Sequence, residues 1–489
     1  MAKKPYFGLK GAWLTFWVTV ACATDMTLFG YDQGVFGGVI VTPDFLDLLG
    51  IASDATMQST VTAIYDVGCF LGAVSVIWIG EPLGRKKTIL LGTTIMSIGA
   101  VLQIAAFGVP QMIVGRVIAG IGNGMNTSTA PVWQGETSKA SWRGKLIVIE
   151  MIMNIFGFML NLESLEPDDP YILAQSKDIQ WAVNYEKENT VPWSKLLRGK
   201  TGPNGGTSTI RRLILGMGAQ AMQQFSGINV TSYYLPLVLI QSVGLDEKLA
   251  RLLAACNSVS YLLFSTIGIP NVERWGRRKM MMYAAAGQCF CYMIITICIR
   301  YNEDPGIGRT ANVQWAKGSI AFFFLYYIFF GIGWQGVPWL YPTEINSLSM
   351  RTKGAALGTA TNWIINFMVV EITPVGIASI GWRFYIIWTV FNASFVPIVY
   401  LFYPETADRS LEDVDRFFQD NQNVLIFRDP DAKSSKRPQK YIEHEREEVR
   451  RNSSVRPSDV QAVLNRRSVA ERANAGLKDE EKGYIQHAE

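Results

Sequence analysis

The residues of this chain best suited to chemistry are uncharged amides inside an apolar segment. Gln220, Gln223 and Gln224 have the i, i+3, i+4 spacing that places side chains on one helix face, and Asn229 lies just beyond them. An amide both donates and accepts hydrogen bonds, which suits a ligand that carries several hydroxyl groups. A single amide would more simply join two neighbouring helices. Four amides on one segment favour a ligand site.

A second group of candidate contacts lies nearer the C-terminus. Trp339 belongs to the stretch GIGWQGVPWLYP, whose glycines and prolines must loosen or break a helix. A broken helix inside a membrane exposes its backbone only where it lines a cavity, and an aromatic ring there could stack on a sugar ring. Tryptophan is also a common anchor at the membrane interface. We favour the cavity for Trp339, and Asn362 and Asn366 add a further amide face.

Charged residues inside apolar segments form a third group. A charge at the centre of a bilayer costs about 3 kcal/mol or more, so such residues are candidates for function. Asp32 and Arg116 have opposite signs and could offset each other's burial. They form either a permanent structural ion pair or a site where Asp32 carries a proton. The sequence identifies no partner for four further acids, which are Asp25, Asp66, Glu150 and Glu371.

The residue types that enzymes use are nearly absent from the sequence. The two histidines, His444 and His487, lie in a polar C-terminal stretch, and all six cysteines lie in apolar segments. The sequence contains no recognisable nucleophile with its base, metal-binding cluster or phosphate-binding loop. We therefore predict that the protein is not an enzyme, and we expect no cofactor, no metal and no nucleic-acid partner.

Apolar segments of helical length dominate the chain and predict a protein of the lipid bilayer. Of 489 residues, 49% are hydrophobic and 18% are charged, and a helix needs about 20 apolar residues to cross a bilayer. Leu146–Leu162 is a marginal span, because it has only about 17 residues and contains Glu150 and Asn154. The ten clear spans are Trp13–Phe36, Ser59–Ile79, Thr88–Phe107, Gln111–Trp133, Leu213–Val243, Leu252–Pro270, Met280–Ile299, Gly318–Tyr341, Ala355–Thr373 and Phe384–Phe402.

Two short basic loops relate the halves of the chain to each other. Gly80–Lys87 reads GEPLGRKK and Val272–Lys279 reads VERWGRRK. The repeated residues are Glu81, Gly84 and Arg85 in one loop, Glu273, Gly276 and Arg277 in the other, and two Glu–Arg pairs seven residues apart, Glu136 with Arg143 and Glu344 with Arg351. The common order indicates parallel repeats, with the ligand site between the two halves.

These patterns predict an all-α membrane protein with two pseudo-symmetric helical bundles. The distribution of Lys and Arg predicts that both termini are cytoplasmic. We divide the chain into an incomplete N-terminal transmembrane bundle (1–162), a central cytoplasmic loop (163–212), a C-terminal transmembrane bundle (213–403) and a cytoplasmic tail (404–489). The tail is rich in mixed charges and is expected to be largely disordered.

The motifs resemble those of the sugar porter family of the major facilitator superfamily, in particular fungal hexose and polyol transporters. Besides the two basic loops, the resemblance rests on GYDQGVFGG at Gly30–Gly38, GRVIAGIGNG at Gly115–Gly124, PVWQGETSKASWRG at Pro131–Gly144, QQFSGIN at Gln223–Asn229, VPWLYPTE at Val337–Glu344 and PETADRSLEDVD at Pro404–Asp415. It implies a carrier of the plasma membrane that transports a hexose or polyol, together with a proton, by alternating access.

The resemblance also implies roles for single residues. It implies that substrate is bound by Gln223, Gln224, Asn229, Trp339 and Asn366, with Gln220 and Asn362 nearby. It implies that Tyr233 and Tyr234 help to close an outer gate, and that Asp32 pairs with Arg116 in proton coupling. The basic loops and the Glu–Arg pairs are expected to act as conformational switches.

Two departures from the family pattern limit these expectations. Met151 stands where many hexose carriers have a substrate-binding glutamine, which weakens the case for glucose over a polyol. Gly157–Leu162 runs directly into a polar stretch, so the sixth helix is absent and we expect about 10 or 11 membrane helices instead of 12. A full-length message would then encode about 50 more residues near Asn161, which is about two membrane crossings with a short loop. The alternatives are a non-transporting sugar receptor and an inactive truncated transporter.

Overall fold

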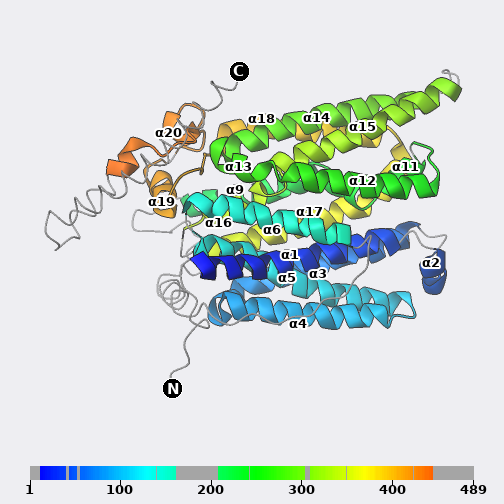
Figure 1. The fold of residues 1–489 in the computed structure, drawn as a ribbon, viewed down its shortest axis with the longest axis horizontal. Coiled ribbons are helices and arrows are strands. Elements are labelled where there is room, and N and C mark those ends of the chain that lie inside the picture. Colours follow the sequence, from blue (N-terminus) through cyan, green and yellow to red (C-terminus); the bar gives the residue numbers. More distant parts are fainter. Residues whose placement is uncertain are drawn as a thin grey trace, which may run out of the picture. The chain divides into compact units, whose positions relative to one another are not determined.

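The long helices of the protein run side by side (Figure 1). The computed structural model describes residues 12–39, 43–51, 55–138, 140–160, 208–241, 243–302, 309–347, 350–421 and 423–443. Helices and short connections account for these residues, with no β-strand in the described ranges, which confirms the predicted all-α fold class. Contacts divide the chain into two units, Met1–Ser435 and Lys436–Glu489, and every helix named below belongs to the first.

The first half of the chain forms five long helices in its described residues. They are α1 (Ala12–Val39), α3 (Ala55–Leu83), α4 (Arg85–Ile104), α5 (Val109–Thr137) and α6 (Ala140–Leu160), with the short helix α2 (Pro43–Leu49) between the first two. α5 packs against α3 and α4, while α1 packs against α6. Small residues allow these close contacts, since a Cβ added at Gly120 would lie 2.2 Å from the Tyr65 carbonyl oxygen.

Three membrane passages of the second half consist of broken helices. The helices are α9 (Ser208–Phe225), α10 (Ile228–Ser232), α11 (Leu235–Gln241), α12 (Glu247–Ser265), α13 (Gly268–Arg274), α14 (Arg277–Asn302), α15 (Arg309–Gly333), α16 (Val337–Ile345), α17 (Arg351–Ile380) and α18 (Arg383–Phe402). The break between α9 and α10 needs Gly227, which has φ +88° and whose added Cβ would lie 2.5 Å from the Tyr292 hydroxyl. The break between α15 and α16 occurs at Trp334–Gly336, within the predicted stretch.

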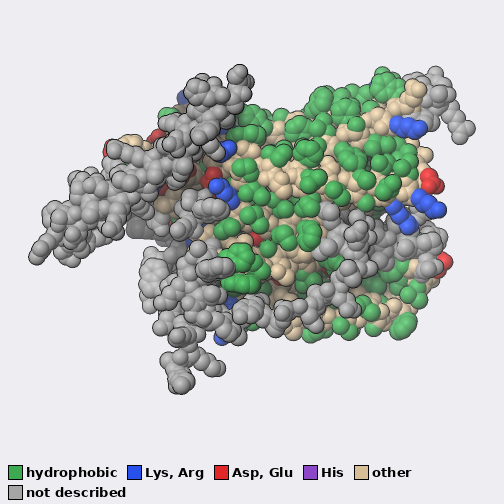
Figure 2. All heavy atoms as spheres, in the orientation of Figure 1, with side chains coloured by type: hydrophobic (Ala, Val, Ile, Leu, Met, Phe, Trp, Pro, Cys, Tyr) green, Lys and Arg blue, Asp and Glu red, His purple; other side chains and the backbone are tan. Residues whose placement is uncertain are grey.

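The helices match the predicted membrane spans. The marginal span, Leu146–Leu162, lies largely in α6. Seven stretches are long and apolar enough to cross a membrane, namely Thr56–Leu83, Arg85–Ile104, Lys248–Arg274, Arg277–Asn302, Lys317–Ile345, Arg351–Ile380 and Arg383–Phe402. On the face shown in Figure 2, apolar side chains cover the middle of the bundle and charged side chains gather towards its two ends. This distribution suits a protein surrounded by lipid.

The two halves follow the same packing order, with one exception. α4 packs against α5 as α14 packs against α15, but α14 also packs against α18. No helix in the described residues of the first half takes the corresponding place beside α4, whose Leu90, Ile98 and Val101 are exposed. Most of the predicted central loop and the place of the missing sixth helix fall within 161–207, which lies outside the described residues.

The tail contains two helices, α19 (Leu411–Asp420) and α20 (Pro430–Lys433). In these two segments the prediction of disorder was wrong. The Ser410 side chain accepts from the Asp413 backbone N–H and the Asp413 side chain accepts from the Ser410 N–H, which caps the start of α19. Phe417 and Phe418 are buried, so the highly charged sequence conceals an amphipathic helix. Residues 444–489 of the tail lie outside the described part of the chain.

Candidate ligand-binding site

The structure brings the six predicted amides together between the broken helix α9–α10 and helix α17. All six are buried side chains, namely Gln220, Gln223 and Gln224 on α9, Asn229 on α10, and Asn362 and Asn366 on α17. They lie in the second half of the chain and come from segments more than 130 residues apart in sequence. The i, i+3, i+4 spacing on α9 and the i, i+4 spacing on α17 place each set on one face.

Asn362 is the centre of the cluster. Its Nδ2 donates to Gln220 Oε1 over 2.7 Å and to Gln223 Oε1 over 2.9 Å. Its Oδ1 accepts from Gln224 Nε2 over 2.9 Å. One amide of α17 therefore contacts all three glutamines of α9.

Asn229 extends the cluster along α17. Its Nδ2 donates to Gln224 Oε1 and also to Asn366 Oδ1. The six side chains consequently form one connected hydrogen-bond network, here called the amide network. Such a network can exchange its internal bonds for bonds to ligand hydroxyls, because each amide offers both donors and acceptors.

The broken helix α15–α16 supplies the backbone groups of the site. Gln223 Nε2 donates to the carbonyl oxygens of Trp334 and Gln335 over 2.7 and 3.2 Å, and Gln220 Nε2 donates to that of Pro338 over 3.0 Å. The break frees the carbonyl groups of Trp334 and Gln335, and Pro342, which has no N–H, leaves the Pro338 carbonyl without its usual helical donor. The amide network satisfies all three carbonyl groups. Trp339 follows directly and is buried on α16.

The two predicted gate tyrosines occupy the turn between α10 and α11. Tyr233 and Tyr234 are both buried. The Tyr234 hydroxyl donates to the carbonyl oxygen of Val370 over 3.2 Å and so joins this turn to α17. Closure by this turn remains a prediction.

The first half of the chain meets the site through aromatic and backbone contacts. Trp363 of α17 donates from Nε1 to Thr127 Oγ1 over 3.3 Å, and its ring makes edge contacts with Phe29 and Tyr65. The carbonyl oxygen of Met151 accepts from Gln335 Nε2 over 3.2 Å. At the position where a glutamine is usual in the family, this backbone group makes the polar contact.

Asp32 and Arg116 are brought together, as the sequence suggested. Arg116 is buried on α5 and donates to two carbonyl oxygens of α3, from Nε to Val61 over 3.3 Å and from Nη2 to Thr62 over 2.7 Å. Its guanidinium lies 4.7 Å from the centroid of the Tyr65 ring and interacts electrostatically with Asp32. The sequence left open whether this pair is structural or carries a proton, and the contacts are compatible with both.

The sequence identified Asp66 as a buried acid but missed its partners. Asp66 lies on α3 and interacts both with Arg116 and with the side chain of Asn366 in the amide network. An acid inside an apolar segment was the available signal. Its two partners lie on other helices, so no spacing in the sequence relates them to Asp66.

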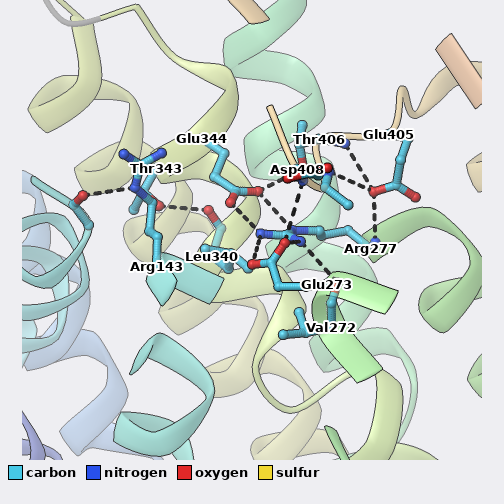
Figure 3. A network of polar contacts seen from close by, with 12 residues as sticks. Arg143, Val272, Glu273, Arg277, Leu340, Thr343, Glu344, Glu405, Thr406 and Asp408 are labelled. Atoms are coloured by element: carbon cyan, nitrogen blue, oxygen red, sulfur yellow. Dashed lines mark hydrogen bonds and ion pairs between the residues drawn. The ribbon is translucent and has the colours of Figure 1, made fainter. Parts of the chain in front are cut away.

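The second basic loop forms a buried ion cluster at one end of the bundle (Figure 3). Arg277 lies between Glu273 and Glu344, with an Nη1–Oε2 distance of 2.7 Å to the former and an Nη2–Oε1 distance of 2.7 Å to the latter. Glu344 Oε2 also accepts from the Thr406 hydroxyl over 2.7 Å, and Glu405 accepts from the backbone N–H of Arg277 over 2.8 Å. The segment after α18 is thereby joined to α13, α14 and α16.

The first basic loop has a smaller counterpart of this cluster. Arg85 Nη2 lies 2.8 Å from Glu136 Oε1, and Glu81 lies 3.3 Å from Lys353 Nζ at the start of α17. The second of these ion pairs joins the two halves of the chain. The sequence did not single out Lys353.

The repeated glycines and the remaining arginines also have defined positions. Gly84 and Gly276 have φ +75° and +84°, the left-handed region that favours glycine, which lets each loop turn directly into a helix. Arg143 Nε donates to the Gly135 carbonyl oxygen over 2.9 Å, and Arg351 is buried at the start of α17. The described residues contain no group of three His, Cys, Asp or Glu side chains arranged to hold a metal ion.

Comparisons with known proteins agree on one family. The profile of the family described as "Sugar (and other) transporter" matches residues 17–162 and 161–418. The chain is 53% identical to the MFS-type transporter oryC of Aspergillus oryzae, over 93% of this chain and 94% of the relative. It is 31% identical to the sugar transporter STL1 of Saccharomyces cerevisiae, over 86% of this chain and 84% of the relative.

The oryC comparison also indicates that this chain lacks residues that the relative has. The alignment has 515 positions, whereas 93% of 489 residues is about 455, so about 60 positions of the alignment have no residue of this chain. The two stretches that match the family profile meet at residues 161 and 162. The gap agrees with the missing sixth helix expected from the sequence.

A solved structure shows the same fold. The proton:xylose symporter XylE of E. coli superposes with a TM-score of 0.67 at 19% identity, over 84% of this chain and 100% of XylE. This chain is therefore a multi-pass membrane protein that belongs to the sugar porter family of the major facilitator superfamily.

Proposed function

We propose that this protein carries a sugar or polyol across the plasma membrane by alternating access, together with a proton, with both termini in the cytoplasm. The observation that carries the proposal is the amide network, in which six uncharged side chains and the freed carbonyl groups of a broken helix meet where the two halves face each other. Groups that both donate and accept hydrogen bonds match a ligand rich in hydroxyls. The names of two similar proteins, a sugar transporter and a proton:xylose symporter, support the same substrate class.

One ion pair between the halves supports alternating access. Glu81–Lys353 joins the halves at one end of the bundle, while Tyr234 joins the α10–α11 turn to α17 within the second half. A ligand between the halves is released on one side when the contacts on that side break and those on the other side form. Proton coupling is supported by the electrostatic interaction of Asp32 with the buried Arg116.

The test is transport by the purified protein in liposomes. We expect uptake of at least one radiolabelled hexose or polyol, and accumulation above the outside concentration when an inward proton gradient is imposed. Liposomes without protein and liposomes with a collapsed gradient are the controls. Binding without uptake, together with signalling in cells that lack their own hexose carriers, would contradict transport and favour a sugar receptor.

A further inference from the structure

Asp66 lies at the contact between the two groups on which the proposed function depends. It projects from α3 with a side chain that is 1% exposed. Its Oδ1 has no hydrogen-bond partner among the described residues. A buried carboxyl oxygen without a donor is costly unless it is protonated or receives a bond from a ligand. The unpaired, buried Oδ1 of Asp66 therefore has to be explained.

Two helices other than its own present partners to Asp66. Arg116 comes from α5, and the amide of Asn366 comes from α17. Asn366 is itself a member of the amide network, through the bond that its Oδ1 accepts from Asn229. Asp66 thus links the ligand site in the second half of the chain to the arginine in the first half.

The charges around Asp66 do not balance when every group is ionised. Arg116 interacts with both Asp32 and Asp66, so one cation faces two carboxylates. The other titratable groups recorded around this cluster in the described part of the chain are Tyr65, Cys69, Tyr234 and, beyond Tyr234, Glu371. None of them supplies a positive charge, so the fully ionised cluster has a net negative charge.

A net charge buried between membrane helices is strongly unfavourable. The cluster removes it by taking up one proton, which the two carboxyl groups share because they interact with the same arginine. When the proton is on Asp32, Asp66 pairs with Arg116. When the proton is on Asp66, Arg116 pairs with Asp32 alone.

We propose that Asp66 is a second proton-binding carboxyl group of this protein and that it links the protonation state to sugar binding through Asn366. The proposal rests on the proposed function. A protonated Asp66 donates its O–H to Asn366 Oδ1 or to a ligand hydroxyl, whereas an ionised Asp66 only accepts. The bond that breaks and forms is the O–H bond of the carboxyl group, and the proton comes from and returns to water on either side of the membrane.

Binding of the sugar by the purified protein from pH 5 to pH 8 tests the proposal, by equilibrium dialysis with the radiolabelled sugar or polyol that wild type takes up. We expect the wild-type Kd to change with pH by up to about tenfold per unit, the limit for one linked proton. Asp66→Asn should bind with a Kd that does not change with pH, and Asp66→Glu, which keeps a carboxyl group, should restore the dependence. Asp32→Asn should also bind with a Kd that changes little with pH, since Arg116 then faces Asp66 alone and the cluster is neutral without a proton.

Glu150→Gln is the matched control, because Glu150 is another buried acid of the first half, on α6, with no recorded contact to the amide network in the described residues. Its binding should follow the wild-type pH profile. A full pH dependence in Asp66→Asn overturns the role of Asp66, and so does an equal loss in Asp66→Asn and Glu150→Gln. A wild-type protein that binds none of the sugars tested overturns the proposed function and this inference with it, whereas wild-type binding without pH dependence overturns this inference alone.

Discussion

At the scale of single residues, the amides of the site are bonded to one another and to freed backbone carbonyls. Asn362 alone contacts three glutamines. A ligand hydroxyl that replaces one of these hydrogen bonds gains little net free energy. Affinity should depend on several modest contacts, with no single dominant one.

We expect Gln224→Ala and Asn229→Ala to weaken sugar binding. Each variant removes hydrogen bonds worth about 0.5 to 1.5 kcal/mol, which raises Kd about two- to tenfold per bond. The measurement is equilibrium binding of radiolabelled sugar to purified protein. Cys256→Ala is the control, because Cys256 is exposed on α12. If all three variants bind equally well or equally badly, the amides serve only to hold helices together.

Asp32→Asn tests proton coupling at the neighbouring pair. Asparagine has nearly the shape of the protonated acid but cannot release a proton, so Arg116 loses its negative partner on α1. We expect uphill accumulation and the pH dependence of uptake to disappear while counterflow exchange persists. Accumulation ratios in liposomes with an imposed proton gradient measure this. Unchanged accumulation would retire Asp32 as a proton carrier.

At the scale of elements, the ion clusters differ in how deeply they are buried. The Arg277 and Glu344 side chains are 1% and 5% exposed, whereas those of Arg85 and Glu136 are 2% and 11% exposed. Arg277 also joins more elements, since the segment after α18 binds the same cluster. Loss of one partner in a buried pair leaves an uncompensated charge, which costs more as burial increases.

We therefore expect Glu344→Gln to destabilise the protein more than Glu136→Gln. Removal of one partner from a buried ion pair costs about 3 to 5 kcal/mol, and the more exposed pair costs less. Thermal unfolding in detergent should show a lower midpoint for Glu344→Gln, with Glu136→Gln between it and the wild type. The reverse order would mean that burial does not set the strength of these clusters.

The helices were predictable and several of their contacts were not. Hydropathy predicts the spans because a bilayer imposes a fixed length of apolar chain, and the stretch around Trp339 predicts a break because proline and glycine disrupt helices. Helix α19 was missed because its charges hide two buried phenylalanines, and one of its contacts is a bond from Arg212 to Asp415, 203 residues away. The partners of Asp66 were missed for the same reason, because contacts between distant segments leave no local pattern.

At the scale of the whole molecule, α18 has no counterpart in the described residues of the first half. The family profile matches in two stretches that meet at residues 161 and 162, and about 60 positions of the oryC alignment have no residue in this chain. That length contains one membrane helix of about 20 residues with its connections. The exposed face of α4, with Leu90, Ile98 and Val101, is where such a helix would pack by analogy with α14 and α18.

We expect the messenger RNA to encode about 60 more residues between the codons for Gly157 and Pro170, one apolar helix among them. Sequencing of the message across these codons measures this directly. A protein with the restored segment should transport faster in liposomes than the 489-residue chain. A continuous message, together with equal uptake by the two proteins, would show that the additional segment is not needed for transport.

The indole of Trp363 lies at a contact between the two halves of the chain, where its fluorescence can report whether they touch. Its ring is buried against Phe29 and Tyr65, and its N–H is bonded to Thr127, all of which belong to the opposite half of the chain. Separation of the halves would expose the ring to water and shift its fluorescence to longer wavelength. Subtraction of the Trp363→Phe spectrum isolates this signal from that of the other tryptophans. If the two halves separate during transport, Trp363 would report that movement without any attached dye.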